Sequence, residues 1–448
     1  MDLKNRHITI IGARKSGIGA AKLIREAGGI PFVSDSGNKE NLKEFIAQLE
    51  KENIPYEMGG HSDRVFACDL MVISPGVPSD VKVIADATKS GIKVISEIEL
   101  ASNFCSGSVI AITGTNGKTT TTSLCDHVFN KAGIKSYAAG NIGLAFSEIA
   151  TEVTKEEVVS LEVSSFQLDF IDKFKPRIAM ILNITPDHLN RYGNKYENYI
   201  NSKLNIYKNQ GNDDYLILNK DSESLINSLT GPKSKIYYFS LKEEVENGCF
   251  CRDKNIYFME GGEEQFKCTL KDINLKGEHN YANAMAVIIA AKIMGLDNKK
   301  IKDALGDFQG VEHRLEFVRQ LDGVRYINDS KATNIDSVWY ALRSFENPIF
   351  LILGGQDKGN DYDQIKELVV NKVKKIYAIG SSADKIFNYF NTIVNVEIKS
   401  SMEDAVKAAN KEARENDIVL LSPACASYDM FQNYEHRGKI FKEAVNRL

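Results

Sequence analysis

The run AITGTNGKTTTTS, residues 111–123, constrains the fold of this chain more than any other stretch. The run VIAIT at 109–113 is largely apolar and has the character of a buried strand. After Lys118 no Gly or Pro occurs until Gly133, which predicts a helix that stops there. The expected strand, turn and helix direct backbone N–H groups and the positive helix end toward one point, where an anion can bind.

The glycines of this turn depart from the common phosphate-loop spacing. That spacing, Gly-x-x-x-x-Gly-Lys-Ser/Thr, would place its first glycine at Ile112. The chain has Gly114 and Gly117 instead, followed by Lys118 and Thr119. The lysine can supply a positive charge to a phosphate, and the threonine hydroxyl can ligate Mg²⁺. We interpret the stretch as a shortened nucleotide-phosphate site; the alternative is a Gly/Asn turn that binds nothing.

Length and composition indicate a globular protein of several domains. The 448 residues suggest about three domains, and 43% hydrophobic with 26% charged residues can bury a core. A formal net charge of -4 without a polybasic run argues against nucleic acid or an acidic membrane as partner. No apolar run has the length of a membrane span, and the first residues enter a predicted strand without a signal-peptide core.

The seven cysteines are scattered and contain no CxxC pair, so zinc and a disulfide framework are not expected. Cys249 and Cys251 could chelate an ion, but we expect two exposed or half-buried thiols. These features predict a reduced, cytoplasmic protein, which we expect to be a monomer.

Strand-like runs alternate with helical stretches along the chain, which predicts an α/β protein with parallel sheets. We expect three domains: a Rossmann-like domain at 1–104, a P-loop-type mononucleotide-binding domain at 105–310 and a second Rossmann-like domain at 311–448. The polar, Gly-containing stretch 247–267 is expected to form hairpins or a surface insertion.

The first domain carries only a weak nucleotide signature. Gly12, Gly17 and Gly19 do not fit the spacing GxGxxG, although Asp35 ends the second predicted strand, where a Rossmann unit places its ribose-binding acid. A nucleotide site and a tight strand–helix connection both remain open for this turn.

Polar residues interrupt or follow two apolar strands of the central domain. Glu162 lies in VVSLEVSS, where a carboxylate is costly unless it is paired or bound to metal, and we favour a magnesium ligand over a buried ion pair. Asp187 and His188 follow the next strand. For His188, a role in the site and a purely structural role are equally open. Lys203, in SKLNIYKN, is by its own context a solvated helix lysine.

Three strand ends of the last domain also carry polar groups, at the edge where open α/β sheets bind ligands. They are NDSKATN with Asp329 and Lys331, LILGGQDKGND with Lys358, and LLSPACASYDMFQNYEHRG with Ser427 and Tyr434. A turn would explain the Asp and Asn of the first stretch but not Lys331 beside them.

Seven motifs between residues 8 and 438 together resemble the ATP-dependent Mur ligases of bacterial cell-wall synthesis. They are GTNGKTTT, GNIG, LEVSSFQL, NITPDHLNRY, HNYANAMA, DSKATN and SPACASYDMFQNYEHRG. The shortened phosphate loop is the form found in that family. LEVSSFQL, DSKATN and SPACAS resemble the branch that adds D-glutamate, rather than the branches that add L-alanine, diaminopimelate or lysine, or D-Ala-D-Ala.

The resemblance implies an enzyme that uses ATP and Mg²⁺ to join D-glutamate to UDP-N-acetylmuramoyl-L-alanine through an acyl phosphate. It implies that the first domain holds the UDP moiety, the second ATP and the third the amino acid. It also implies that Lys203 is carbamylated.

The site residues implied by the resemblance fall into four groups. The nucleotide group is Gly114, Thr115, Asn116, Gly117, Lys118, Thr119, Thr120, Asn283, Arg314 and Asp329. The metal group is Thr119, Glu162, His188 and Lys203, and the catalytic group is Lys118, His188, Lys203 and Lys331. The substrate group is Ser36, Asn141, Thr333, Lys358, Ser427 and Tyr434.

One departure from the family pattern concerns the first domain. Relatives often place Thr-Arg after the acid of the second strand, and this chain has Ser36 and Gly37 there. The contacts to uracil or diphosphate are therefore open, with Arg14 or Lys15 as candidates to replace them. A folylpolyglutamate-synthetase-like ligase and a non-catalytic nucleotide sensor are the rival functions.

Overall fold

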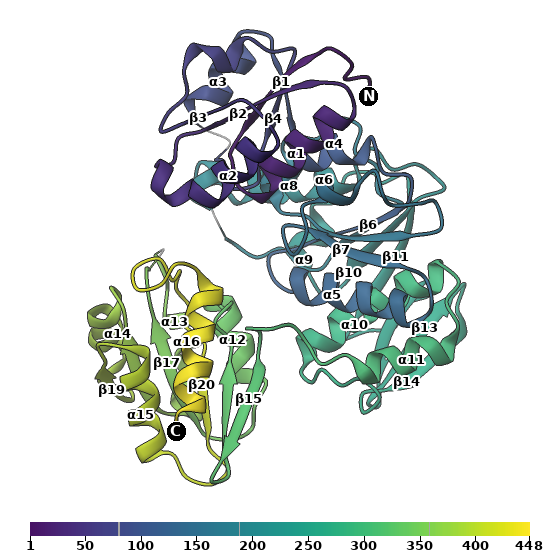
Figure 1. Cartoon of the computed structure of the whole chain (residues 1–448). Coiled ribbons are helices and arrows are strands. Elements are labelled where there is room, and N and C mark those ends of the chain that lie inside the picture. Colours follow the sequence, from purple (N-terminus) through teal and green to yellow (C-terminus); the bar gives the residue numbers. More distant parts are fainter. Residues whose placement is uncertain (79–80, 188, 358) are drawn as a thin grey trace. The chain divides into compact units, whose positions relative to one another are not determined.

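The computed structural model describes residues 1–78, 81–187, 189–357 and 359–448, which form three β-sheets flanked by helices (Figure 1). The chain divides into two compact units. One contains Met1–Asn274 and Asn280–Phe308, and the other contains Leu275–His279 and Gln309–Leu448. The predicted α/β class is confirmed.

The first sheet is a five-stranded parallel sheet in the order β3-β2-β1-β4-β5. This is the strand order of a Rossmann-like domain. Its strands are β1 (His7–Ile11), β2 (Ile30–Asp35), β3 (Tyr56–Met58), β4 (Leu70–Ile73) and β5 (Lys93–Ser96). The main helices are α1 (Lys15–Glu26), α2 (Lys43–Lys51), α3 (Lys82–Lys89) and α4 (Glu97–Ser102). Strands such as β4, with the sequence LMVI, are buried throughout because apolar helix residues cover both faces of the sheet.

The second sheet has nine strands in the order β14-β13-β12-β11-β10-β9-β6-β8-β7. Its parallel part consists of β6 (Ser108–Thr113), β7 (Ser136–Gly140), β8 (Val158–Glu162), β9 (Ile178–Ile181), β10 (Tyr215–Asn219) and β11 (Lys235–Ser240). The helices of this region are α5 (Lys118–Lys131), α6 (Phe146–Ile149), α7 (Ser165–Leu168), α8 (Tyr196–Leu204), α9 (Glu223–Asn227), α10 (Glu278–Ile293) and α11 (Asn298–Asp307).

Three further strands extend this sheet and confirm the hairpins predicted for 247–267. They are β12 (Gly248–Arg252), β13 (Asn255–Glu260) and β14 (Glu263–Thr269), with antiparallel pairing between successive strands. The prediction that Cys249 is exposed or half-buried is wrong, because β12 lies between β11 and β13 and the thiol is fully buried. Cys251 is half-buried, as expected.

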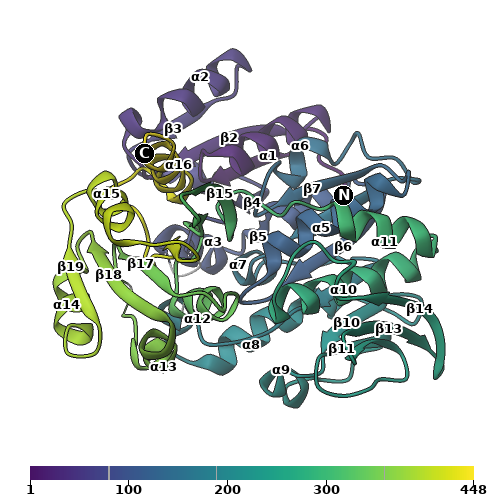
Figure 2. The same cartoon turned by 90° about the horizontal axis from the view of Figure 1, so that it is seen from below.

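The third sheet has six strands in the order β15-β16-β20-β17-β18-β19, and all pairs except β15–β16 are parallel. Its strands are β15 (Glu316–Leu321), β16 (Val324–Asn328), β17 (Ile349–Gly354), β18 (Val373–Ile379), β19 (Asn395–Ile398) and β20 (Ile418–Leu421). Helices α12 (Ile335–Arg343), α13 (Asp363–Lys372) and α14 (Ala383–Phe390) pack on one face. Helices α15 (Met402–Glu412) and α16 (Tyr434–Asn446) pack on the other (Figure 2).

The predicted domain boundaries near residues 104 and 310 both fall between a helix and the following strand. Helix α4 ends at Ser102 and β6 begins at Ser108, while α11 ends at Asp307 and β15 begins at Glu316. The exact boundaries remain predictions.

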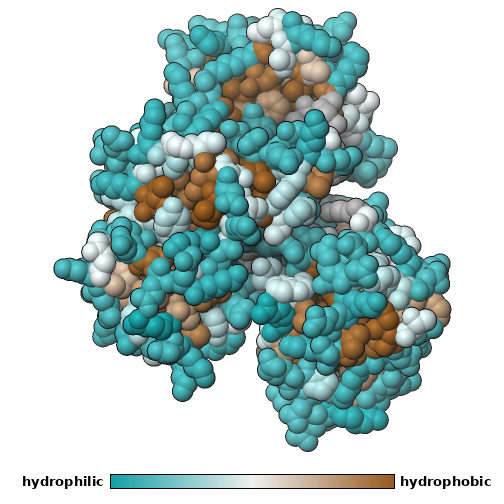
Figure 3. Space-filling view, turned by 180° about the vertical axis from the view of Figure 1, so that it is seen from behind, coloured by the Kyte–Doolittle hydropathy of each residue, from teal (hydrophilic) through white to brown (hydrophobic). Residues whose placement is uncertain are grey.

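The outer surface is mixed in character. On the face shown in Figure 3, apolar side chains form separate patches among hydrophilic ones. Within the described part of the chain, no helix combines the length and the apolar character needed to cross a membrane.

Candidate active site

The loop at residues 114–117 joins the buried strand β6 to helix α5, as predicted from the sequence. Gly114 has φ +158 and Gly117 has φ +85, conformations that favour glycine. A Cβ on Gly117 would lie 2.6 Å from Oδ1 of Asn283, so a side chain does not fit at this position. Helix α5 ends at Lys131, and Gly133 follows with φ +89, which confirms the predicted stop.

A segment that follows β9 holds this loop in place. The side chain of Asn183 accepts from Asn116 N at 2.9 Å and donates to Asn116 O at 3.1 Å. Thr115 N donates to Asn183 O at 3.0 Å, and the Thr115 hydroxyl donates to Thr185 O at 3.0 Å. The loop is therefore shaped by the protein before any ligand binds.

The lysine of the loop points back over the loop itself. Lys118 Nζ donates to Gly114 O and to Thr115 O, both at 2.8 Å. Thr119 and Thr120 follow in the first turn of α5, where both are buried. The ammonium group thus lies at the mouth of the anion site predicted for this turn.

Glu162 is the last residue of β8, between β6 and β7, and its side chain is buried. Its Oε1 accepts from Asn141 Nδ2 at 2.9 Å, and no cation of the described chain forms an ion pair with it. Its Oε2 is also buried and has no hydrogen-bond partner among these residues. A buried carboxylate oxygen without a donor is costly, so the position suits a bound cation.

The GNIG turn is fixed against the same strand. Asn141 N donates to Glu162 O at 3.0 Å, in addition to the side-chain bond. Gly140 has φ +100, and a Cβ there would lie 2.3 Å from Glu162 O. The close approach of these two backbones holds Asn141 beside the carboxylate.

Lys203, on α8, is only 1% exposed, so the prediction of a solvated lysine is wrong. Its Nζ donates to Gly114 O at 2.9 Å and lies 4.7 Å from the centroid of the Tyr199 ring. Gly114 O therefore accepts from both Lys118 and Lys203. Burial and, second, the charge of Lys118 hold the pKa of Lys203 well below its usual range, although nearby carboxylates act in the opposite direction.

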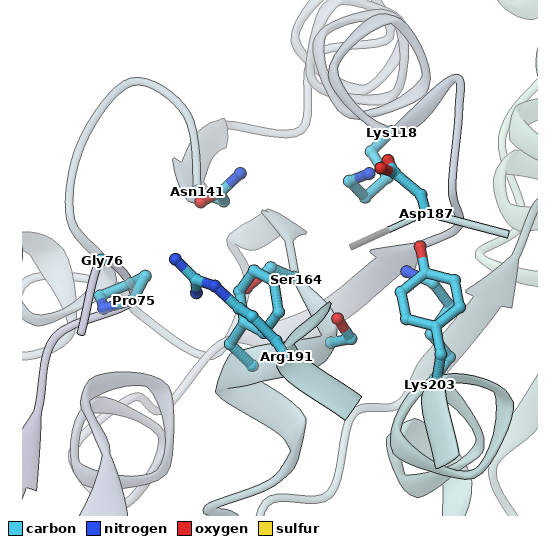
Figure 4. Close-up of a pocket in the computed structure, with 11 residues that line it drawn as sticks. Pro75, Gly76, Lys118, Asn141, Ser164, Asp187, Arg191 and Lys203 are labelled. Carbon is cyan, nitrogen blue, oxygen red and sulfur yellow. The ribbon is translucent and has the colours of Figure 1, made fainter. Parts of the chain in front are cut away.

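A pocket of about 280 Å³ joins these groups in the first unit (Figure 4). Its lining residues are Pro75, Gly76, Lys118, Asn141, Ser164, Ser165, Phe166, Asp187, Arg191, Tyr199 and Lys203. Figure 4 shows Lys118, Asp187 and Lys203 on one side and the Pro75–Gly76 turn on the other. The guanidinium group of Arg191 points toward that turn and Asn141.

The first β–α turn of the chain is a tight connection. The Asp35 carboxylate accepts from Ala13 N and from Gly37 N, both at 2.7 Å. Ser36, Arg14 and Lys15 are exposed. The Asp35 carboxylate therefore closes the turn. This favours a tight strand–helix connection over a ribose-binding site, the two alternatives that the sequence leaves open.

A second group of predicted residues lies in the other unit, around Asp329. This carboxylate is buried and accepts from the Ser422 hydroxyl at 2.9 Å and from Leu315 N at 3.2 Å. Burial raises the pKa of Asp329 to about 7, although the charge of Arg314 opposes the shift. Lys331 Nζ lies 5.2 Å from the centroid of the Tyr434 ring.

Arg437 joins two of the three polar strand ends of this unit and is fully buried. Its Nε donates to the Ser330 hydroxyl at 3.0 Å and its Nη2 to Ser330 O at 2.7 Å. Its Nη1 donates to Cys425 O at 3.0 Å. The stretches DSKATN and SPACAS are thus held together by one side chain.

We expect Arg437→Met to destabilise the second unit by at least about 3 kcal/mol, because buried acceptors lose charge-assisted hydrogen bonds. Hydrogen–deuterium exchange of the β16 and β20 amides in the full chain measures this change. The exposed Arg447, the residue directly after α16, provides the control Arg447→Met, with an expected change within about 0.5 kcal/mol. Equal protection in both variants would contradict the role given to Arg437.

Comparisons with known proteins agree across the whole chain. The profile of the Mur ligase middle domain matches residues 112–291, that of the Mur ligase glutamate ligase domain 313–425, and that of the MurD N-terminal domain 8–83. The UDP-N-acetylmuramoylalanine–D-glutamate ligase of Salinibacter ruber is 41% identical over 100% of this chain and 99% of its own. The protein of the same name from Koribacter versatilis is 43% identical, with the same coverage. This chain belongs to the Mur ligase family.

Solved structures show the same fold at low identity. The UDP-N-acetylmuramate–alanine ligase of Thermotoga maritima has a TM-score of 0.63 at 19% identity and covers 99% of this Mur ligase and 100% of its own chain. The MurF ligase of the same organism, solved in complex with ADP, has a TM-score of 0.61 at 15% identity, with 93% and 95% covered. The predicted fold class of this Mur ligase, an α/β protein with three sheet-containing domains, is therefore confirmed.

The structure of this Mur ligase brings many of the predicted residues into two groups. The first unit gathers Lys118, Asn141 and Lys203 around the pocket, with Glu162 bonded to Asn141 and Asn283 against Gly117. The second unit contains Arg314, Asp329, Lys331, Thr333, Ser427 and Tyr434. His188 and Lys358 lie outside the described residues, and all the assigned site roles remain predictions. Arg191 was not among the predicted site residues, although it belongs to the motif NITPDHLNRY.

Proposed function

We propose that this Mur ligase joins D-glutamate to UDP-N-acetylmuramoyl-L-alanine and converts ATP to ADP and phosphate. The observation that carries the proposal is that Lys118, Asn141 and Lys203 line the same pocket. The full-length relatives that carry the name UDP-N-acetylmuramoylalanine–D-glutamate ligase support the choice of substrates.

The first chemical step brings two negatively charged groups together, a carboxylate and a phosphate. The terminal alanine carboxylate attacks the γ-phosphorus of ATP, an acyl phosphate forms, and the bond to ADP breaks. The loop N–H groups and Lys118 offset the charge that repels the carboxylate and stabilise the charge of the transition state. Asn283, which packs against Gly117, and Arg314 and Asp329 of the second unit are the further residues proposed for nucleotide binding.

The residues around Glu162 fit a magnesium site. Its unpartnered Oε2 is the kind of hard ligand that Mg²⁺ prefers, and the Thr119 hydroxyl belongs to the first turn of helix α5, directly after the phosphate loop. We propose Thr119, Glu162, His188 and Lys203 as the metal-binding residues. When bound, Mg²⁺ would neutralise phosphate charge during the transfer.

Lys203 can serve a metal only if it ceases to be an ammonium group. Its buried position and the nearby ammonium group of Lys118 favour the neutral amine. A neutral amine adds to CO₂ and releases a proton, which leaves a carbamate anion with two oxygens. We therefore propose that Lys203 acts as a carbamate.

The second chemical step is attack of the D-glutamate amine on the acyl carbon, after which phosphate leaves and the amine loses a proton. Water must be kept from the acyl phosphate during this step. Lys331, Thr333, Lys358, Ser427 and Tyr434 are proposed to surround the amino acid and the reacting phosphate. Lysine and hydroxyl groups suit the carboxylates of D-glutamate.

A phosphate-release assay tests this function. We expect release with ATP, Mg²⁺, UDP-N-acetylmuramoyl-L-alanine and D-glutamate together, and a loss of at least about a hundredfold when D-glutamate is replaced by L-glutamate. Release with a folate acceptor and glutamate instead would favour the folylpolyglutamate-type ligase. Nucleotide binding without turnover under every condition would favour the sensor.

A further inference from the structure

Arg191 is a cationic residue of the pocket, and one of its buried N–H groups finds no hydrogen-bond acceptor in the described part of the chain. It lies on the short 3₁₀ helix Leu189–Tyr192, and its guanidinium carbon is 4.1 Å from the centroid of the Phe166 ring. Its Nη1 is buried and has no hydrogen-bond partner among the residues that the structure describes. An unsatisfied buried donor on a charged group is unfavourable, so the arrangement suits a ligand that supplies an acceptor.

The direction of this side chain separates it from the phosphate loop. Figure 4 shows the guanidinium group pointing toward Asn141 and the Pro75–Gly76 turn, with Lys118 and Lys203 on the opposite side of the pocket. Apart from its two chain neighbours, no residue that the structure describes would lie within 4 Å of a Cβ on Gly76. Among the described lining residues, Lys118, Arg191 and Lys203 are the basic ones, and of these Arg191 is the one that points toward Gly76.

The proposed substrate has two anionic parts, a terminal carboxylate and a diphosphate. The carboxylate must reach the phosphate loop, because it reacts there with ATP. The diphosphate is left for the other side of the pocket. A planar guanidinium group matches phosphate oxygens with parallel N–H donors, which makes arginine well suited to this partner.

In the first domain, the two residues that follow the acid of the second strand offer no cation for this role, and the exposed Arg14 and Lys15 remain the other candidates for the diphosphate. The residues after Asp35 are Ser36 and Gly37, which carry no charge, and the Asp35 carboxylate is bonded to Ala13 N and Gly37 N. We propose that Arg191 binds the diphosphate of the UDP-sugar substrate. This inference rests on the proposed function and assigns a substrate contact within it.

The test compares two probes that differ in the diphosphate, UDP and uridine, by calorimetric titration of the full chain. We expect Arg191→Gln to weaken UDP binding about tenfold to a hundredfold and to leave uridine binding unchanged. Arg191→Lys should restore part of the UDP affinity, because it keeps the charge but loses the planar donor fork. Arg252, at the end of β12, is an exposed arginine whose guanidinium group lies near the rings of Phe250 and Tyr257. It provides the matched control Arg252→Gln, for which we expect no change in the binding of either probe.

Kinetics give a second measurement. In Arg191→Gln, the KM for UDP-N-acetylmuramoyl-L-alanine should rise by the same factor as the UDP dissociation constant, while kcat and the KM for ATP stay within about threefold. Unchanged UDP binding would overturn the proposal, and so would equal losses for UDP and uridine, which indicate a structural role. Failure of the ligase reaction in the unaltered protein would overturn the proposed function separately, since the UDP and uridine titrations require no turnover.

Discussion

We expect Lys118→Ala to lower kcat by about a thousandfold while the protein remains folded. The ammonium group bonds the carbonyl oxygens of Gly114 and Thr115 at the surface of the loop and does not belong to the hydrophobic core. Its removal takes away a charge that the transition state needs, whereas the loop remains held by Asn183. Phosphate release measures the loss, and circular dichroism checks the fold.

Lys131 provides the matched control for this change. It lies at the other end of α5, where its exposed ammonium group pairs with Asp307. Lys131→Ala should therefore retain turnover within about twofold, as expected for a surface ion pair of small energy. A folded Lys118→Ala variant with near-normal turnover would show that the loop does not bind the transferred phosphate.

The second large effect concerns Lys203. We expect Lys203→Ala to lose at least about a hundredfold in kcat, because a proposed metal-binding group disappears. Acetate or formate should restore part of the activity, since a small carboxylate can supply the missing oxygens. Lys203→Arg should be as inactive as the alanine variant, because arginine keeps a positive charge and does not form the carbamate.

The carbamate itself has a direct readout that does not depend on activity. Carbon-13 NMR of the unaltered protein with labelled bicarbonate should show a carbamate signal that is absent from Lys203→Ala. Lys195→Ala, at the exposed residue before α8, should keep both the signal and the turnover. Full activity in buffer free of CO₂, or no signal in the presence of magnesium and substrate, would refute the carbamate.

The features predicted well from the sequence are those decided by local context. The strand, turn and helix around Lys118 follow from an apolar run, two glycines and an uninterrupted helical stretch, all within one short segment. A carboxylate in an apolar strand needs a partner, which predicts a role for Glu162, and its Oε2 indeed has no donor within the described part of the protein.

The features that were missed depend on segments far apart in the chain. Lys203 is buried because its Nζ reaches Gly114 O, which lies 89 residues earlier. Arg191 depends on Phe166, a residue of another motif, for the stacking that orients it. Neither contact leaves a periodic signal in the sequence around the residue itself, so helix patterning alone predicts a solvated side chain.

The bonds that Asn183 makes to the phosphate loop have a consequence for the entropy of binding. Fixing the backbone of one residue costs about 1–2 kcal/mol, and a flexible loop would meet this cost when its ligand arrives. In this chain the ordering of residues 115 and 116 by Asn183 and Thr185 already occurs during folding. Nucleotide binding should therefore show only a small unfavourable conformational entropy at the loop, and loosening Asn183 should weaken affinity without removing any atom that touches phosphate.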